Sequence, residues 1–543
     1  MDRRFFLKKH FSALGIIAAC LIVGFFSGDY IHFDPLEAIA EFPGGFGWFL
    51  VEFVPDAESF EQLPRILGAL FKTVLDAIAA GSLAAVLAYV LAIVASRVTG
   101  VGGVVQLVIR AFATVLRNIP TVAWGFVLLF SFKQAEFTGL LALFFKSLGF
   151  LTRTFIETID EVDKGAIESL RAAGATRLQI MVRGVIPLTM TQIVSWVLYM
   201  IETNFRDATL VGMLTGSGIG FVFNWYYRTF RYHTAGLVIV AIAIAVILIE
   251  VCSNYVRRRI DGAAAGTPFA EAAALRRRLR IRPWTASRVI LVALFGFLAA
   301  MTVFTFLQMD YGKADLSRAA TDLLKYFGIM LLSPHLVNYT VGETASAMAV
   351  TLAIAVLATL GGMIIAFVLS LAAASNLSNK ALSNLIKILM ALIRSVPTII
   401  WVLVFTVAIG LGAEAAIVGM MFHTVSFLTK AYSEAFEEVD RGVMDALKAT
   451  GATWFQQIAR GVMPEKLNEV LSWTFIRFEN NFIGAVTAGA IAGSGGIGYQ
   501  LYMVANYMFD WHEVGLIIYL CLAVSITLEV IATRLRKRFI VQR

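Results

Sequence analysis

Charged residues are scarce in this sequence of 543 residues. Asp, Glu, Lys and Arg together make up 15% of it, against 59% apolar residues, and the mean hydropathy is +0.78. Because soluble domains carry about 25% charged residues, this composition excludes a soluble protein and indicates a polytopic membrane protein. The net charge of +8 does not indicate a nucleic-acid partner, because the basic residues gather beside the ends of apolar segments, where membrane topology explains them.

Cysteine is equally rare. Cys20, Cys252 and Cys521 lie inside apolar runs and share no metal-ligand spacing, so we expect them to be small buried hydrophobic residues. The six histidines are scattered, and no cluster resembles a nucleophile with its base or a metal site. We therefore predict no catalytic residues, no metal site and no enzymatic activity.

Two expected motifs are also missing. No Gly-x-x-x-x-Gly-Lys-Ser/Thr loop occurs in the sequence, so we predict no nucleotide-binding phosphate loop in this chain. The first apolar stretch follows basic residues, as in a secretory signal, but it has no Ala-x-Ala cleavage site. We interpret it as a retained helix.

Long apolar segments are abundant. A helix needs about 20 apolar residues to cross a bilayer, and helices satisfy their own backbone groups in lipid. The runs are too continuous for the alternating pattern of an outer-membrane barrel. We predict an all-α protein with about 12 transmembrane helices, near residues 11–27, 67–95, 105–131, 138–156, 189–204, 236–255, 287–307, 346–373, 385–411, 413–432, 467–487 and 514–532.

The second half of the sequence repeats the first. The stretch Arg117-Asn118-Ile119-Pro120-Thr121 recurs 277 positions later as Arg394-Ser395-Val396-Pro397-Thr398. Residues 157–187 share 15 of 31 positions with 434–464, where chance gives about two. We predict a first transmembrane repeat at 1–256, a basic cytoplasmic linker at 257–286 and a second repeat at 287–543.

Charge distribution predicts the orientation of the repeats. The basic N-terminus, the basic linker and the basic tail at 534–538 belong on the cytoplasmic side by the positive-inside rule. Six crossings per repeat return the chain to that side, so the repeats are parallel. Residues 29–64 carry eight acids and no Lys or Arg, which suits an outer loop.

Each repeat contains one polar segment between its fourth and fifth apolar segments, at about 157–187 and 434–464. Each segment is typical of a short helix, a break at Gly174 or Gly451, and a second short helix that ends before Pro187 or Pro464. Small residues at such a break let another protein approach the backbone closely. An ordinary glycine-capped loop is the alternative, and the duplication in register favours docking.

These segments resemble the EAA loop of binding-protein-dependent ABC importer permeases. The pattern is Glu168-Ser-Leu-Arg-Ala-Ala-Gly174 before Pro187, and Asp445-Ala-Leu-Lys-Ala-Thr-Gly451 before Pro464. In that family the loop forms a coupling helix that sits in a groove of a cytoplasmic ATPase. The second copy departs from the pattern because Asp445 stands where Glu is expected. The resemblance implies ATPase-coupling residues Glu168, Ala172, Ala173, Gly174, Asp445, Ala449 and Gly451.

Further residues resemble the phosphonate permease branch of that family. They are the Arg-x-Ile/Val-Pro-Thr segments and the run from Glu202 to Gly220, whose second copy begins at Glu479 and ends at Gly498. Ile483 replaces the arginine matched by Arg206, so we expect an asymmetric pathway. The resemblance implies a type I importer permease fold made of two fused units in a bacterial inner membrane, with both termini cytoplasmic.

The same resemblance implies partners. They are two cytoplasmic ABC ATPase subunits, which bind ATP and Mg so that this chain needs no cofactor, and a periplasmic or lipid-anchored phosphonate-binding protein. Membrane lipid surrounds the chain, and the substrate is a small oxyanion. We predict no nucleic-acid partner.

Polar groups at membrane depth are costly and usually face a cavity or a partner. Arginine forks and amide donors suit a phosphorus oxyanion. We therefore predict a substrate pathway at Glu202, Asn204, Arg206, Glu479 and Asn481. Arg117 and Arg394 are weaker candidates, because arginines at such positions more often reach back to the headgroups.

Two alternatives stay open at this point. A permease of the same architecture for phosphate, phosphite or another small solute would have the same sequence pattern. A secondary transporter can also consist of two six-helix halves, but it predicts a titratable relay deep in the bundle, and the duplicated docking loops would have no purpose.

Overall fold

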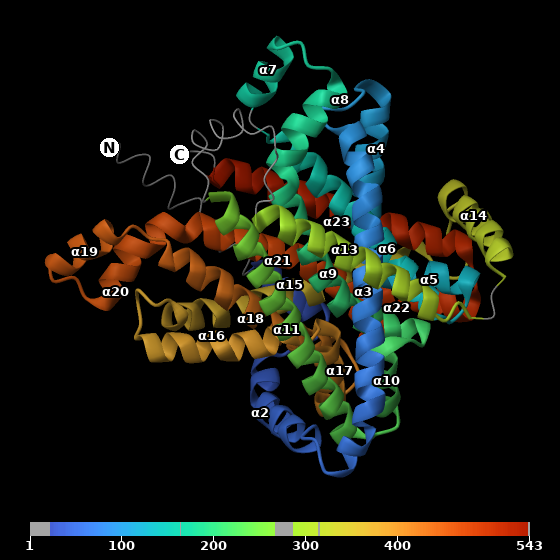
Figure 1. Ribbon diagram of the computed structural model, residues 1–543. Helices are drawn as coiled ribbons and strands as arrows, with labels where there is room; N and C mark the ends of the chain where they lie inside the picture. Colours follow the sequence, from blue (N-terminus) through green and yellow to red (C-terminus); the bar gives the residue numbers. More distant parts are fainter. Residues whose placement is uncertain (1–21, 163, 266–285, 313–314, 541–543) are drawn as a thin grey trace. The chain divides into compact units, whose positions relative to one another are not determined.

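The computed structural model describes residues 22–162, 164–265, 286–312 and 315–540, and every regular element in these ranges is helical (Figure 1). The helices form two compact units. Unit 1 comprises residues 1–54 and 325–543, and unit 2 comprises residues 55–324. The predicted all-α class is confirmed.

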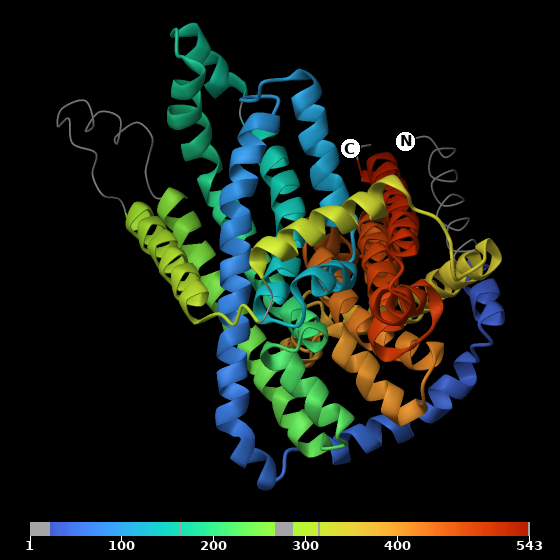
Figure 2. The same ribbon diagram turned by 90° about the vertical axis from the view of Figure 1, so that its right-hand side faces the viewer.

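Unit 2 is built around three long helices, α3, α6 and α9, which pack on one another. Figure 2 shows α10 and α11 (green) beside α3 (blue). The elements of unit 2 are η1 (Glu58–Gln62), α3 (Leu63–Ala95), α4 (Gly103–Asn118), α5 (Thr121–Phe132), α6 (Glu136–Asp160), α7 (Lys164–Ala172), α8 (Arg177–Ile180), η2 (Met181–Val185), α9 (Ile186–Thr215), α10 (Gly218–Arg228), α11 (Tyr232–Ala265) and α13 (Ala286–Gln308).

Unit 1 repeats this arrangement around α15, α18 and α21. Its core includes Leu428, Tyr432 and Phe436, each fully buried. The elements of unit 1 are α2 (Pro35–Glu52), α15 (Val341–Ala373), α16 (Lys380–Ser395), α17 (Thr398–Ile409), α18 (Ala413–Glu437), α19 (Arg441–Ala449), α20 (Trp454–Gln457), η3 (Ile458–Val462), α21 (Met463–Ala492), α22 (Gly496–Met503), η4 (Val504–Met508) and α23 (Trp511–Ile540), and α14 (Leu316–Leu332) crosses the boundary between the units.

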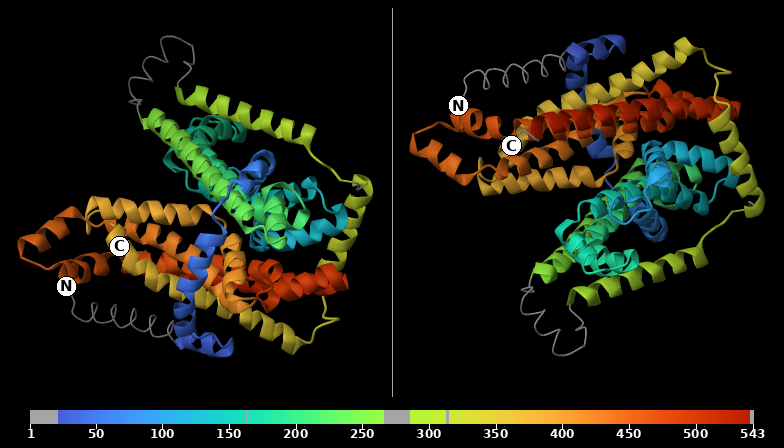
Figure 3. Two further views of the ribbon diagram at one scale, coloured as in Figure 1. Left: turned by 90° about the horizontal axis from the view of Figure 1, so that it is seen from below. Right: turned by 90° about the horizontal axis from the view of Figure 1, so that it is seen from above.

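Each unit contains a helix from the other half of the sequence. In unit 2, α13 packs on α3 and lies beside α11 (Figure 3), where Ile290 and Leu294 contact the cluster around Ile260. In unit 1, α2 packs on α17, with the Phe42 and Phe405 rings stacked at 5.8 Å. The compact units therefore exchange the segments that precede the second apolar segment of each repeat, and a sequence boundary near residue 256 does not separate them.

The predicted apolar segments correspond closely to helices. Seven helices of the described residues are long and apolar enough to cross a membrane, or ten when three bent pairs each count as one span. The segment predicted at 413–432 forms α18, which is less apolar, and the segment predicted at 11–27 lies mostly outside the described residues. Of the linker predicted at 257–286, the part up to Ala265 continues α11, and residues 266–285 lie outside the described residues.

Two predicted spans bend sharply at proline. Pro120 precedes α5 and Pro397 precedes α17, and the flanking helices meet at 94° and 87°. Proline has no N–H to donate, and it disfavours helical geometry in the residue before it. Ile119 and Val396 are accordingly extended, with ψ of 123° and 128°. The duplicated proline therefore ends one helix and starts the next in both units.

The predicted helix ends before Pro187 and Pro464 are wrong. Residues 177–215 form one continuous helical span through the π-helical turn η2, and 454–492 do so through η3. Pro187 and Pro464 lie in the first turn of α9 and α21. A proline in a regular helix breaks an i to i−4 hydrogen bond, and the wider i to i+5 turn before it absorbs that disruption.

Candidate functional site

The polar segment of unit 2 forms a hairpin at one end of the bundle. α7 ends at a turn in which Gly174 has φ of 76°, a left-handed conformation that glycine adopts without strain. The chain then enters α8, where the Thr176 hydroxyl accepts from the N–H of Gln179 and the Gln179 side chain accepts from the N–H of Thr176. This reciprocal cap fixes the start of the second helix. Figure 1 shows α7 and α8 beyond the end of α9.

Unit 1 forms the same hairpin from α19 and α20. Gly451 has φ of 77°, and the reciprocal cap joins Thr453 to Gln456. Trp454 also donates from its ring nitrogen to the carbonyl of Leu377 at 2.9 Å. The two hairpins therefore have the same backbone geometry although they belong to separate compact units.

Glycines beneath each hairpin let its first helix pack closely. A Cβ on Gly184 in η2 would lie 2.9 Å from Leu170 of α7, and a Cβ on Gly461 in η3 would lie 2.8 Å from Leu447 of α19. A Cβ at either position would displace the end of that leucine side chain, so glycine allows the closest packing here. Sequence reasoning did not single them out, although both occur in the duplicated triplet Arg-Gly-Val.

The predicted docking residues lie on the outer surface of these hairpins. No atom of the described residues lies within 4 Å of a Cβ built on Gly174 or Gly451, so glycine is favoured at these positions by the left-handed turn and not by packing against the described part of the chain. A flat, open surface at the break is what close approach by another protein needs. All seven predicted residues are exposed: Glu168, Ala172, Ala173, Gly174, Asp445, Ala449 and Gly451.

A duplicated ion pair anchors the helix that leads into each hairpin. Asp160, the last residue of α6, accepts from Arg110 of α4 at 2.7 Å, from the Ser96 hydroxyl and from the N–H of Arg97. In unit 1, Glu437 accepts from Lys387 of α16 and from the N–H of Ser375, both at 2.7 Å. Asp160 corresponds to Glu437 and Arg110 to Lys387, so both residue types differ between the repeats while the ion pair is present in each. Sequence reasoning missed it because the partners are 50 residues apart.

Two predicted pathway residues, Asn204 and Asn481, are fully buried between helices of their own units. Asn481 of α21 donates to Thr359 of α15 at 2.8 Å and to Thr424 of α18 at 3.0 Å. Asn204 of α9 accepts from Ser147 of α6 at 2.9 Å. Both asparagines therefore connect transmembrane helices in this structure.

Two other predicted pathway residues, Glu202 and Arg206, form an ion pair. Arg206 donates to Glu202 at 3.1 Å, and Arg257 of α11 lies 3.7 Å from the second oxygen of Glu202. Glu479 is half-buried in α21, near Asn481. Arg117 and Arg394 occupy the last turns of α4 and α16, and both are half-buried. The structure thus places Glu202 and Arg206 together and leaves Arg117 and Arg394 at helix ends.

A basic cluster in unit 1 was missed. Arg477 of α21 is 6% exposed, donates to the ring of His423 and to the hydroxyl of Thr424 at 3.0 Å each, and lies 5.5 Å from the centre of the Phe427 ring. No carboxylate of the described residues lies within ion-pair distance of it. Its counterpart 277 positions earlier is Met200, so a search for duplicated motifs could not find it.

Several carboxylates are also buried. Glu513 is fully buried and accepts from Asn338 and from the N–H of Tyr339. Glu136 is 6% exposed and lies 3.3 Å from Lys72. These local donors explain both as structural anchors. Among the described residues, no group of three or more His, Cys, Asp or Glu side chains could hold a metal ion.

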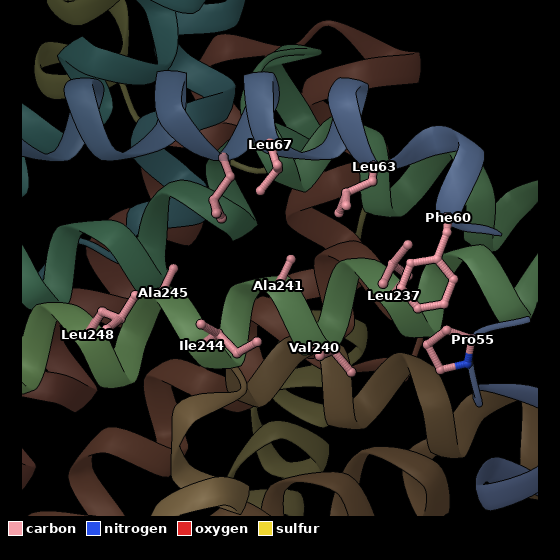
Figure 4. A pocket seen from close by; sticks show the side chains of 11 residues that line it. Pro55, Phe60, Leu63, Leu67, Leu237, Val240, Ala241, Ile244, Ala245 and Leu248 are labelled. Atoms are coloured by element: carbon pink, nitrogen blue, oxygen red, sulfur yellow. The ribbon is translucent and has the colours of Figure 1, made fainter. Parts of the chain in front are cut away.

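An apolar groove of about 410 Å³ lies between α3 and α11 in unit 2 (Figure 4). Side chains such as Leu67 and Ile244 line it, and no polar side chain does. It offers nothing to recognise an anion. The described cysteines differ in burial. Cys252 of α11 is exposed, whereas Cys521 of α23 is buried. The expectation of buried cysteines is therefore wrong for Cys252.

The sequence matches one known family twice, at residues 84–265 and 366–541. The family is described as the inner membrane component of binding-protein-dependent transport systems. The chain belongs to this family. Both matches contain one of the two hairpins, so the predicted pair of permease units fused in one chain, with a multi-pass inner-membrane location, is confirmed. The family match also supports a transport subunit.

Individual members of this family are similar over different lengths. The phosphate-import permease protein PhnE of Mycolicibacterium smegmatis is 25% identical over 480 residues, 88% of this chain and 86% of that protein. The phosphite transport system permease protein PtxC of Stutzerimonas stutzeri is 29% identical over 45% of this chain and 85% of its own length. A putative cryptic phosphonate transport system permease protein, PhnE2 of Escherichia coli, is 34% identical over 22% of this chain and 98% of its own length. The predicted resemblance to the phosphonate permease branch is thereby confirmed.

Proposed function

We propose that this chain is the membrane-spanning permease of an importer for phosphonate or a related phosphorus oxyanion, driven by ATP hydrolysis in separate subunits. The observation that carries the proposal is the pair of hairpins with matching left-handed glycines, one in each compact unit. Two copies of one exposed docking surface suit a motor that itself has two copies. The relatives named for phosphate, phosphite and phosphonate support the substrate class, and phosphate or phosphite remains the alternative.

The proposed assembly contains one copy of this chain and two cytoplasmic ABC ATPase subunits, which bind ATP and Mg. A periplasmic or lipid-anchored binding protein delivers the oxyanion to the outer mouth. Both termini and both hairpins then lie on the cytoplasmic side, as the basic residues near the chain ends favour. No cofactor binds to this chain, and no nucleic acid takes part.

The proposed mechanism is mechanical coupling. When the ATPases close on ATP, each pulls on one hairpin, and the pull reaches the membrane through a stiff connection. Residues 177–215 and 454–492 are continuous spans that begin in a hairpin, so a displaced hairpin displaces the fifth predicted span of its repeat. The proposal requires two states of the bundle with different affinity for the anion.

The predicted pathway at Glu202, Asn204, Arg206, Glu479 and Asn481 stays part of the proposal. The ion pair of Arg206 with Glu202 gives Arg206 a gating role in it: the anion competes with Glu202 for the guanidinium. Replacing Arg206 with alanine and measuring uptake beside ATPase activity tests this assignment, and unchanged uptake would remove Arg206 from the pathway.

The coupling proposal is tested at the hairpin turns. In the reconstituted transporter, the double variant Gly174→Val, Gly451→Val should lose uptake by at least tenfold, because a β-branched residue is strained at φ near 76° and its side chain covers the docking surface. The matched variant Gly174→Asn, Gly451→Asn keeps the turn, since Asn tolerates the left-handed region, but it also adds a side chain. Comparing the two variants therefore separates strain in the turn from covering of the docking surface.

Two measurements decide the result. ATPase co-purification should fall in the valine variant while membrane insertion of the chain stays normal. Normal recruitment and uptake in that variant would contradict the coupling role. Uptake of methylphosphonate, phosphate and phosphite by the unmodified transporter then ranks the oxyanions, and uptake of methionine with none of these would overturn the substrate class.

A further inference from the structure

In unit 1, an arginine that has no acidic partner among the described residues lies in the middle of α21. Arg477 is 14 residues from the start of α21 and 15 from its end, so it lies about 21 Å from either end of the helix. A buried charge in a transmembrane helix is costly and is usually kept for a function. Basic side chains near helix ends can reach the headgroups, whereas His423 and Thr424 hold the Arg477 guanidinium inside unit 1.

The guanidinium is held by neutral groups. His423 accepts from Nη2 through Nδ1, and Thr424 accepts from Nε, each at 3.0 Å. Because arginine only donates, Nδ1 of His423 must be the acceptor, so the ring is neutral with its proton on Nε2. These contacts fix the orientation of the guanidinium plane without neutralising its charge.

Part of the arginine fork remains available. Guanidinium has five N–H donors, and the two recorded hydrogen bonds use one on Nε and one on Nη2. No described residue accepts from Nη1. The free donors on Nη1 and Nη2 lie in one plane, the arrangement that binds two oxygens of a phosphate or phosphonate side by side.

The corresponding place in unit 2 differs in charge. The counterparts of Arg477, His423 and Thr424 at the 277-residue offset are Met200, Lys146 and Ser147. Lys146 forms an ion pair with Asp207, and the counterpart of Asp207 in unit 1 is Gly484. Lys146 of unit 2 therefore has an acidic partner, whereas Arg477 of unit 1 has none among the residues that the structure describes.

We propose that Arg477, oriented by His423 and Thr424, is an anion-binding residue of the permease and takes the phosphorus oxyanion at the level of the middle of α21. The proposal rests on the proposed function and adds that unit 1 alone supplies this contact. His423 and Thr424 are positioning residues in it. Since Arg477 is 6% exposed, the anion reaches it only after the bundle opens, so this structure corresponds to a closed arrangement of unit 1.

The test uses the complete transporter with its ATPase and binding protein in proteoliposomes. Arg477→Met, which copies the residue of the first repeat, should lower methylphosphonate uptake at least tenfold, and Arg477→Lys should keep part of it because the charge remains without the fork. His423→Leu should raise the KM for transport several-fold, whereas His423→Asn should stay close to the unmodified chain because its oxygen replaces Nδ1 as acceptor. Met200→Leu, a volume-conserving change at the counterpart position, is the matched control.

Thermal unfolding separates a binding role from a structural one. A buried charge held for function costs stability, so Arg477→Met should unfold at the same or a higher temperature than the unmodified chain. Two outcomes would overturn the proposal. The first is uptake by Arg477→Met within twofold of the unmodified chain. The second is a loss of uptake in Arg477→Met that comes with a lower unfolding temperature and is not relieved in Arg477→Lys. If the unmodified transporter imports no phosphorus oxyanion at all, the proposed function fails with it, whereas failure of the variants alone leaves the proposed function standing.

Discussion

Single polar side chains connect the transmembrane helices of each unit, and the two units differ in how well those side chains are satisfied. The Nδ2 atom of Asn481 donates to Thr359 and Thr424. The Nδ2 atom of Asn204 has no hydrogen-bond partner among the described residues, because Gly81 stands where unit 1 has Thr359. A Cβ on Gly81 would lie 3.4 Å from that atom. Asn481 of unit 1 therefore makes more hydrogen bonds between helices than its counterpart Asn204 of unit 2.

This difference predicts unequal effects of substitution. Asn481→Leu breaks two interhelical hydrogen bonds and should cost about 1 to 2 kcal/mol, given about 0.6 kcal/mol per bond in membranes plus the unpaired hydroxyls left behind. Asn204→Leu should cost less than half of that. Thermal unfolding of the purified chain measures both. Equal losses of stability would contradict this difference between the units, and lost uptake with unchanged stability in Asn481→Leu would show that Asn481 acts in the pathway and not as a helix connector.

In the proposed mechanism, the elements that transmit force are the end of α6 and the end of α18. Each is held to the preceding bent span by one ion pair, Arg110 with Asp160 and Lys387 with Glu437. The chain enters α7 and α19 within four residues of these acids. The direction in which each hairpin leaves the bundle therefore depends on this connection.

Removing the charge at both acids should uncouple ATP hydrolysis from transport. We expect Asp160→Asn, Glu437→Gln to lower uptake three- to tenfold while much of the ATPase activity is kept, because Arg110 and Lys387 lose their partners and the hairpins become mobile relative to the spans. Glu157→Gln, which removes an exposed i,i+4 pair with Arg153, is the control and should have little effect. A proportional loss of ATPase and uptake would contradict the role in coupling. The ratio of uptake to ATP hydrolysed is the quantity to measure.

At the scale of the whole molecule, the two compact units are interleaved in the sequence. Unit 1 needs residues up to 54 from the first half of the chain, and unit 2 needs residues up to 324 from the second half. Phe49 of α2, for example, lies 5.6 Å from the Trp401 ring in unit 1. Neither half of the sequence therefore contains a complete compact unit.

A split chain tests this interleaving. Residues 1–265 and 286–543 produced as two polypeptides in the same cell should co-purify, because each completes the other's compact unit. Residues 286–543 alone should be degraded or aggregate, since α17 loses its contact with α2. Stable accumulation of that half alone, with an unfolding temperature close to that of the pair, would contradict the requirement.

Local sequence patterns were sufficient to predict most helices and both hairpins. Apolar length identifies spans, and a glycine between two short polar helices identifies a turn, because both depend on residues close in the chain. The prediction that helices end before Pro187 and Pro464 was wrong because the structure there depends on residues that are not close in the chain. A π-helical turn is stabilised by its surroundings, and proline alone does not reveal it.

Contacts between residues far apart in the sequence explain the features that sequence analysis did not predict. The sequence by itself determines the duplication, the all-helical class, the family and the glycine positions of the two hairpins. Each of these depends only on residue types and their spacing along the chain. Only the tertiary structure decided which helices complete each unit and that Asn204 and Asn481 lie between helices. It also decided that Arg477 lies beside His423 with no acid of the described ranges in reach. Such contacts join residues far apart in the sequence, and their energies depend on burial and distance, which no local pattern specifies.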